Sequence, residues 1–289
     1  MTILAPLRGV TTRLFRETFA VEIADAGFDE AVTPFISAMH GVDPLADREL
    51  AGGARSGGLK VTPQFIGKDP VSLRRCLERT KGAGFDTADL NCGCPFPMVR
   101  NKGRGSGILK TPDVLRRMLE VGCETMGAGG FSVKARIGVD RKDELLGLMP
   151  LLNEFPLRFL AVHPRTARQM YSGECDMAAF DAVAAVAKMP IVRNGDVPLP
   201  AIGGGHVMIG RAFLRGLGAR PDSRELLVRY SAALRREMCG ARPVLGAIKE
   251  LVSYWKEIAP WNRLWNVLKI CRTLDELDSV EKSPVFDKA

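Results

Sequence analysis

Eight short apolar runs constrain the fold of this chain more than any other feature. They lie at residues 2–6, 31–36, 59–65, 87–91, 131–136, 159–163, 190–193 and 206–210. Each run is short enough to be a strand buried on both faces, and segments with helical spacing follow several of them, as at 70–81 and 112–123. Eight strands that alternate with helices predict an α/β fold, namely a TIM (β/α)8 barrel over residues 1–220.

The connection between the last two runs is too short for a complete unit. About a dozen residues separate Asn194 from Val207, whereas a crossover that contains a helix takes roughly a dozen or more. The intervening residues 195–205 include two prolines and three consecutive glycines. We therefore expect a barrel that lacks the helix between strands 7 and 8.

After residue 220 the helical pattern continues without strands, which predicts a small helical domain at 221–289. This part of the chain is also basic. Residues 211–272 hold 13 Lys or Arg against 5 Asp or Glu, and the difference of 8 equals the net charge of the whole chain. Such a concentration favours a polyanionic partner such as nucleic acid, although a solvated basic helix surface has the same composition.

Several features bear on the compartment. No run approaches the roughly 20 apolar residues of a membrane span, and no basic and apolar leader opens the chain. The seven cysteines are odd in number and form no pair of Cys-x-x-Cys knuckles, so we expect reduced thiols and no metal site. We expect a monomer in the cytoplasm that makes no membrane contact.

Polar side chains follow the fourth, fifth and sixth predicted strands, where a barrel carries its active site. Cys94 stands just after the fourth strand, close to Asn91, and is a candidate nucleophile, proton donor or structural thiol. The next two strands end on Lys134, Arg136, His163 and Arg165. Together these residues predict an electropositive pocket around a thiol.

Glycine-containing turns follow the seventh and eighth strands, where barrels of this kind frequently bind a phosphate. The residues are Asn194, Gly195 and Asp196 after the seventh, and Gly210 and Arg211 after the eighth. A third glycine-rich run at 102–107 lacks the Walker spacing and does not directly follow a strand, which excludes an ATPase loop. We interpret it as a mobile basic flap or a plain flexible loop, with Lys102 as a candidate substrate contact.

Several segments, taken in order along the chain, resemble the tRNA dihydrouridine synthase family. They are Ala5-Pro6-Leu7, Val61-Thr62-Pro63-Gln64-Phe65, Leu90-Asn91-Cys92-Gly93-Cys94-Pro95, Lys134-Ala135-Arg136-Ile137-Gly138, His163-Pro164-Arg165-Thr166 with Gln169 and Tyr171-Ser172-Gly173, Asn194-Gly195-Asp196, and Val207-Met208-Ile209-Gly210-Arg211. The resemblance covers most of the predicted barrel.

This resemblance implies an FMN-dependent enzyme that reduces the C5–C6 double bond of a uridine in tRNA, with NADPH as the reductant and Cys94 as the general acid. It implies that FMN contacts Ala5, Pro6, Leu7, Gln64, Asn91, Lys134, His163, Asn194, Gly195, Asp196, Gly210 and Arg211. Arg136 and Arg165 would orient the base or the flavin. In the helical domain the candidate tRNA contacts are Arg235, Arg236, Arg242 and Lys249.

The sequence also departs from the family pattern. Pro164 stands where the family usually has Gly, Phe96-Pro97 replaces a commoner polar pair, and the connection between strands 7 and 8 is short. Two other functions therefore stay open. One is an FMN-dependent barrel oxidoreductase for a small pyrimidine or enone, and the other is a non-catalytic RNA-binding homologue.

Overall fold

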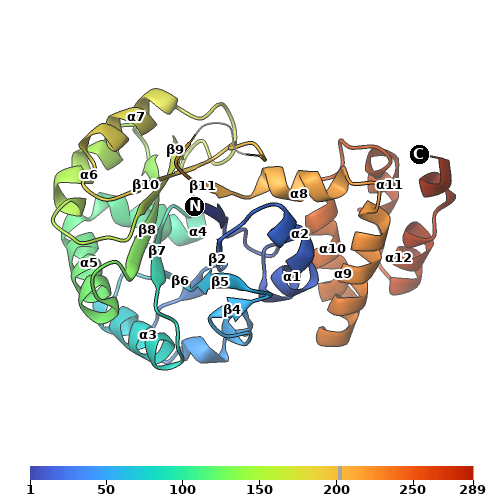
Figure 1. Cartoon of the computed structure of the whole chain (residues 1–289), viewed down its shortest axis with the longest axis horizontal. Coiled ribbons are helices and arrows are strands. Elements are labelled where there is room, and N and C mark those ends of the chain that lie inside the picture. Colours follow the sequence, from blue (N-terminus) through green and yellow to red (C-terminus); the bar gives the residue numbers. More distant parts are fainter. Residues whose placement is uncertain (201–203, 289) are drawn as a thin grey trace.

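The computed structural model describes residues 1–200 and 204–288, and it consists of a barrel with a bundle of helices beside it (Figure 1). The barrel strands are β1 (Thr2–Leu4), β2 (Glu30–Val32) with β3 (Ile36–Ser37), β5 (Leu59–Thr62) with β6 (Gln64–Ile66), β7 (Ala88–Cys92), β8 (Phe131–Gly138), β9 (Leu160–Thr166), β10 (Ile191–Asn194) and β11 (His206–Ile209). Neighbouring barrel strands pair in parallel, and β1 pairs with both β2 and β11. The predicted barrel is therefore confirmed.

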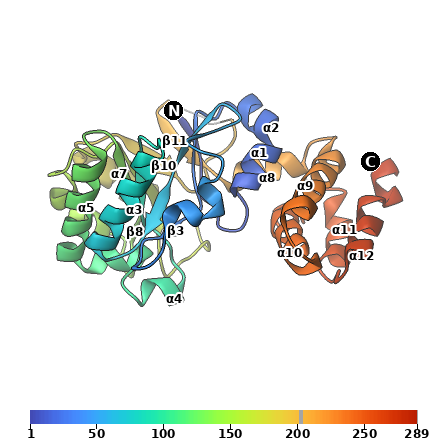
Figure 2. The ribbon, with the colours of Figure 1, turned by 90° about the horizontal axis from the view of Figure 1, so that it is seen from below.

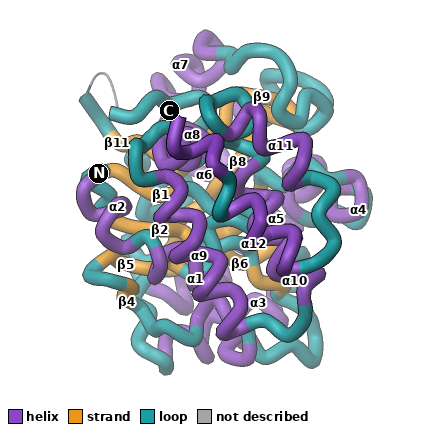
Figure 3. Tube along the Cα trace, turned by 90° about the vertical axis from the view of Figure 1, so that its right-hand side faces the viewer, coloured by secondary structure: helices purple, strands orange, loops and turns teal. Residues whose placement is uncertain are grey.

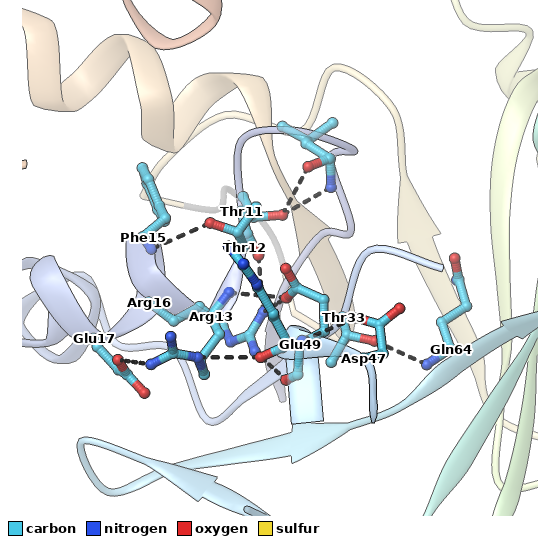
Figure 4. A network of polar contacts seen from close by, with 12 residues as sticks. Thr11, Thr12, Arg13, Phe15, Arg16, Glu17, Thr33, Asp47, Glu49 and Gln64 are labelled. Atoms are coloured by element: carbon cyan, nitrogen blue, oxygen red, sulfur yellow. Dashed lines mark hydrogen bonds and ion pairs between the residues drawn. The ribbon is translucent and has the colours of Figure 1, made fainter. Parts of the chain in front are cut away.

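Two of the predicted strands are interrupted by proline. The run at 31–36 divides into β2 and β3 around Pro34, and the run at 59–65 divides into β5 and β6 at Pro63. A proline has no N–H to donate to the ladder, so a strand that contains one breaks or bulges there. At this break the Thr33 hydroxyl accepts a hydrogen bond from the backbone N–H of Gln64 at 3.1 Å (Figure 4).

A third proline, Pro164, lies inside β9 and coincides with an irregularity in the pairing. Arg136 of β8 is opposite His163, but Gly138 is opposite Thr166, so β9 has one additional residue at this point. A bulge releases one residue from the ladder, which is how a strand accommodates a proline without losing a hydrogen bond. The bulge in β9 therefore accommodates Pro164, which stands where the family usually has Gly.

Helices cover the outside of the barrel. They are α1 (Arg13–Thr18), α2 (Ala20–Asp25), α3 (Pro70–Gly82), α5 (Pro112–Met126), α6 (Glu144–Leu152), α7 (Met177–Val186) and α8 (Arg211–Gly218). The short helix α4 (Pro97–Arg100) instead follows the end of β7 and has no buried residue. We predicted that no helix connects strands 7 and 8. None of the described residues of this connection, 195–200 and 204–205, is helical. The prediction also covers residues 201–203, which lie outside the described residues.

The second connection also lacks an α-helix, which the sequence analysis did not predict. Residues 38–58, all of them described, contain only the 3-10 helices Pro44–Ala46 and Arg48–Leu50 and the short strand β4 (Arg55–Ser56), which pairs with β5 in antiparallel fashion. A buried ion pair holds this connection against α1. Arg16 is 1% exposed, and its Nη1 donates to Glu49 at 3.0 Å (Figure 4).

The C-terminal helices are α9 (Ser223–Glu237), α10 (Ala241–Val252), α11 (Trp261–Leu268) and α12 (Leu274–Glu281), followed by a 3-10 helix at Pro284–Lys288. In Figures 1 and 2 they lie to one side of the barrel, next to α1, α2 and α8. Figure 3 views the molecule from that side, with the bundle in front of the barrel. No helix in the described part of the chain is both long and apolar enough to cross a membrane.

The bundle and the adjoining helices of the barrel share one hydrophobic core. Tyr230 of α9 packs against Phe15 of α1 and Phe19, with ring centroids 6.0 Å and 5.4 Å apart. Trp255 is fully buried and donates its indole N–H to the carbonyl of Leu214 in α8 at 2.7 Å. This shared core holds the bundle in a defined position beside the barrel mouth. The division at residue 220 into catalytic and tRNA-binding domains stays a prediction.

Candidate active site

A cavity of about 330 Å³ opens where the barrel strands end. Its walls contain most of the predicted site residues, namely Ala5, Pro6, Leu7, Asn91, Cys94, Lys134, Arg136, His163, Asn194, Gly195, Asp196, Gly210 and Arg211. These residues come from six strand ends that are far apart in the sequence and adjacent in the ring. The volume lies within the range of about 300–1,000 Å³ that is usual for ligand pockets.

The turn that carries Cys94 is held by Asn91. The side-chain oxygen Oδ1 of Asn91 accepts hydrogen bonds from the backbone N–H groups of Gly93 at 3.1 Å and Cys94 at 2.9 Å. Cys94 is 7% exposed, and burial raises the pKa of its thiol, so the group is protonated at neutral pH. Cys92 is fully buried in the barrel core instead and does not line the cavity.

The glycine-rich run after Cys94 is packed, and the interpretation of 102–107 as a mobile flap is wrong for its second half. Gly105, Ser106 and Gly107 are buried in a 3-10 helix at Gly105–Lys110, and the Ser106 hydroxyl donates to the carbonyl of Cys94 at 2.9 Å. A Cβ on Gly105 would lie 2.7 Å from that of Cys94. The segment therefore supports the thiol from behind. Lys102 is exposed and lies outside the cavity walls.

A chain of buried hydrogen bonds lies behind Asn91. Its Nδ2 donates to Oε1 of Gln64 at 2.7 Å, and Nε2 of Gln64 donates to Asp89 at 2.8 Å. The Ser132 hydroxyl donates to the other oxygen of Asp89 at 2.7 Å. Gln64 is fully buried and is not among the cavity walls, so the structure places it behind Asn91. Its predicted contact with the flavin stays a prediction.

Lys134 brings a cation into the cavity. Its ammonium has no hydrogen-bond or ion-pair partner within the described residues, although Arg136 and Asp89 act on it electrostatically. Burial, and after it the charge of Arg136, lowers the pKa of Lys134 to about 8. Lys134 is half-buried, and a half-buried donor with no protein partner fits a site that receives an acceptor or an anion from a ligand.

Arg136 lines the cavity, and two of its three side-chain nitrogens already donate to backbone carbonyls. Its Nε donates to the carbonyl of Gly93 at 3.0 Å, and Nη1 donates to those of Thr166 at 3.0 Å and Met170 at 2.6 Å. Its guanidinium also lies over the ring of Tyr171 at 5.3 Å. Arg136 therefore ties the cysteine turn to the loop after β9.

His163 is neutral in this setting. Burial, followed by the charges of Lys134, Arg136 and Arg165, lowers the pKa of its imidazole far below the usual range. Its Nε2 lies 3.2 Å from Nη1 of Arg165, which can only donate, so Nε2 accepts and Nδ1 carries the proton. His163 thus offers an N–H donor and not a positive charge.

Asp196 bridges two arginines at the edge of the cavity. It forms ion pairs with Arg165 and Arg211. Partial burial would raise the pKa of its carboxyl, but the hydrogen bond from Arg165 and the charge of Arg211 outweigh it and lower the pKa, so the group is ionised. Arg165 is 3% exposed and is not among the cavity walls, so the structure places it behind His163 and Asp196.

Two glycines at the cavity are required by close contacts. Gly195 has φ of +91°, and a Cβ there would lie 2.8 Å from Cδ2 of His163. A Cβ on Gly210 would lie 3.1 Å from that of Ala5. Gly210 also precedes α8, so the unpaired N–H groups of the first turn of that helix lie at the cavity edge. Such a helix end favours an anion.

Sequence reasoning missed several residues of the cavity wall, among them Arg8, Phe35 and Tyr171. Arg8 lies over the ring of Phe35 at 5.1 Å, and Tyr171 lies under both Arg136 and Arg211. Arg8 directly follows the predicted segment 5–7, and Tyr171 stands within a segment that resembled the family, so both could have been found as its neighbours.

A larger groove of about 1170 Å³ adjoins the cavity and runs between the barrel mouth and α10. The two share Leu7, Arg8, Phe96, Tyr171, Arg211 and Arg215. On the bundle side the groove is lined by Met238, Pro243, Ala247, Tyr254 and Lys256, among others. It therefore leads from the cavity onto the helical bundle.

The four predicted tRNA contacts of the bundle divide into two pairs, none of them in the groove wall. Arg236 and Arg242 are exposed and have no hydrogen-bond or ion-pair partner among the described residues. Arg235 instead pairs with Asp278 at 2.6 Å, and Lys249 donates to the carbonyl of Cys271 at 2.6 Å. The first pair is free for an external partner, and the second holds the bundle together.

Comparison with known proteins shows what this chain is similar to. The solved structures it resembles include an old yellow enzyme homologue from Zymomonas mobilis, with a TM-score of 0.52, 13% identity and coverage of 78% of this chain and 87% of that one. Morphinone reductase in complex with tetrahydroNAD matches with a TM-score of 0.51, 13% identity and coverage of 84% and 89%. At this identity the likeness shows the fold alone.

Similarity in sequence is more specific. A tRNA-dihydrouridine synthase B from Vibrio cholerae is 30% identical over 220 residues, which cover 72% of this chain and 66% of the relative. A tRNA-dihydrouridine(16) synthase from Shigella flexneri is 30% identical over 228 residues, which cover 73% and 71%. The chain thus spans about two thirds of the length of these relatives. The family described as dihydrouridine synthase (Dus) matches residues 3–215. This chain therefore belongs to the dihydrouridine synthase family of oxidoreductases.

Proposed function

We propose that this protein is an FMN-dependent tRNA dihydrouridine synthase that reduces the C5–C6 double bond of a uridine with NADPH as reductant. The observation that carries the proposal is the cavity, which places a protonated thiol, that of Cys94, beside the unpaired ammonium of Lys134. Family membership supports the same reaction.

The cavity walls fit a flavin mononucleotide. Ala5, Leu7 and Met208 offer an apolar surface for a flat ring, and Lys134 offers a free donor for its polar edge. At the other side, the start of α8 and Arg211 offer N–H groups and positive charge for a phosphate. The absence of a side chain at Gly210 lets the start of α8 lie against Ala5 and Leu7, since a Cβ there would be 3.1 Å and 3.2 Å from their side chains.

When bound, FMN reduced by NADPH supplies a hydride for C6 of the uridine. The protein residues supply the rest of the reaction. The thiol of Cys94 donates a proton to C5, so the base gains two hydrogens, and water later reprotonates the thiolate. Burial keeps this thiol protonated at neutral pH, which a proton donor requires. His163 offers an N–H donor without adding a charge that would repel Lys134.

We also propose that tRNA lies in the groove and over the bundle, and that the protein acts as a monomer in the cytoplasm. A stacked uridine must leave its helix to reach a cavity at the barrel mouth, at a cost of a few kcal/mol. The groove gives the surrounding nucleotides a surface continuous with the cavity. Arg236 and Arg242 are free to contact phosphates and offset part of that cost.

The test is a two-step flavin experiment on the purified chain. We expect flavin absorption bands after expression, bleaching by NADPH without oxygen, and recovery of the bands when tRNA that lacks dihydrouridine is added. Recovery with a small pyrimidine or enone but not with tRNA would identify the alternative oxidoreductase. Binding of tRNA without any flavin bands, even with added FMN, would identify the non-catalytic RNA-binding homologue.

The role of Cys94 as general acid is tested by replacing Cys94 and, in a separate variant, the nearby Cys92 with alanine. Cys94→Ala should keep flavin binding and reduction by NADPH but lose about 10²–10⁴-fold in dihydrouridine formation, the usual contribution of a general acid. Cys92→Ala is the matched control, because Cys92 is buried in the core and does not line the cavity. Equal product yield from the wild type and Cys94→Ala would remove Cys94 from the mechanism.

A further inference from the structure

The buried hydrogen-bond chain behind Asn91 has a direction, and that direction matters for Cys94. Asn91 and Gln64 carry side-chain amides, each with one donor end and one acceptor end. Either amide would fit its space if it were turned around, so the contacts of the chain decide which way each one faces. The direction is therefore set by the groups at the two ends of the chain, which must agree: the backbone N–H groups of Gly93 and Cys94 can only donate, so the other end must accept.

The accepting end is Asp89. Burial raises the pKa of its carboxyl to about 6, so at neutral pH the group is mainly ionised and can only accept. It takes hydrogen bonds from Ser132 at 2.7 Å and from Nε2 of Gln64 at 2.8 Å. With Nε2 committed to Asp89, Oε1 of Gln64 faces Asn91 and accepts from its Nδ2 at 2.7 Å. Asp89, Gln64 and Ser132 are all fully buried, so water is not there to replace a lost partner.

The other end of the chain is the cysteine turn. Because Nδ2 of Asn91 is used by Gln64, its Oδ1 faces the N–H groups of Gly93 and Cys94 and accepts both. If the chain ran the other way, Nδ2 of Asn91 would face these two N–H groups, and donors would meet donors. The turn would then lose two hydrogen bonds at the residue that carries the thiol.

We propose that Asp89 is a positioning residue, whose side-chain oxygen accepts from Gln64, keeps the direction of the amide chain in agreement with the N–H groups of the Cys94 turn, and thereby holds that turn in place for proton donation. This inference rests on the proposed function only for its consequence in catalysis. The geometric part concerns the position of a thiol and can be measured without any turnover.

Three variants separate hydrogen-bond direction from packing and charge. Asp89→Asn keeps the direction, because its oxygen can accept from Gln64 while its NH2 donates to the Ser132 hydroxyl. Ser132→Ala also keeps it, because Asp89 still accepts from Gln64. In the double variant Asp89→Asn with Ser132→Ala, the Asn NH2 has Oε1 of Gln64 as its remaining acceptor in the chain, which favours the reversed direction.

The readout is the rate at which iodoacetamide alkylates Cys94, followed by mass spectrometry of peptides with FMN at the same saturating concentration throughout. The exposed Cys239 is an internal control in the same samples. We expect each single variant to stay within about threefold of the wild-type rate and the double variant to differ by about tenfold or more, because coupled residues are not additive. Dihydrouridine formation should follow the same pattern, with KM for tRNA unchanged.

Two results would overturn the proposal. Effects of the single variants that simply add up in the double variant would mean that Asp89 and Ser132 contribute packing alone. A change in the alkylation rate of Cys94 that is as large in Asp89→Asn as in the double variant would also overturn it. The position of the thiol would then depend on the negative charge of Asp89 beside Lys134 and not on the direction of the hydrogen-bond chain. If the wild type forms no dihydrouridine, the proposed function fails, while the alkylation rates still decide the positioning role.

Discussion

We expect one substitution in the turn at Gly195, Gly195→Ala, to lower both the stability of the protein and its affinity for FMN. Two effects contribute to the loss of stability. A residue other than glycine at φ of +91° has a strained backbone, which costs about 1–2 kcal/mol. The new Cβ would also lie 2.8 Å from Cδ2 of His163 and 3.0 Å from Sγ of Cys175, and such overpacking costs about 1–3 kcal/mol. We expect a total loss of about 2–5 kcal/mol in the free energy of unfolding.

Gly27→Ala is the matched control for the backbone strain. Gly27 has φ of +73°, and a Cβ there would meet nothing within 4 Å, so this variant has the strain without the clash. Each kcal/mol lowers Tm by about 2–4 °C in chains of roughly this size. Thermal unfolding should therefore place Tm of Gly195→Ala about 2–12 °C below that of Gly27→Ala.

The same substitution should weaken FMN binding, because His163 lines the cavity and must move to admit the new methyl group. We expect a loss of about tenfold or more in FMN affinity, measured by fluorescence titration, whereas Gly27→Ala should bind as the wild type does. Equal Tm values for the two variants together with unchanged FMN affinity would refute the reasoning, since the close contact with His163 would then have no energetic consequence.

Two further predictions concern charge. Burial lowers the pKa of Lys134 to about 8, so its ammonium is charged below that pH and neutral above it, and FMN affinity should fall as the pH rises through about 8. Lys134→Met should bind FMN less tightly at pH 7 and lose this step in the titration, and an unchanged step would assign it to another group. In the bundle, Arg236→Ala with Arg242→Ala should lower the slope of log affinity for tRNA against log salt by about 2, one for each lost phosphate contact. Arg235→Ala with Lys249→Ala should lower Tm and leave that slope unchanged, because these side chains bind within the bundle, and the reverse pattern would contradict the division into two pairs.

Local sequence was sufficient for the barrel and for most of the cavity. Lys134 and Arg136 are two residues apart on one strand, so they face the same side, and both line the cavity. Residues after each predicted strand meet at one end of a parallel barrel whatever the details of its helices. This is why Cys94, His163 and Gly210, which are far apart in the chain, could be assigned to one site from spacing and family resemblance.

What a side chain does within the site was decided by tertiary contacts. Gln64, Arg165 and Arg235 were all predicted to contact a ligand, yet the structure surrounds each with protein partners. The sequence by itself determined the barrel, the thiol and the basic bundle, because these depend on residue type and on the spacing of apolar residues along the chain. Only the tertiary structure decided which polar groups are free and which are already paired, because a partner such as Asp278 for Arg235 comes from a distant part of the chain.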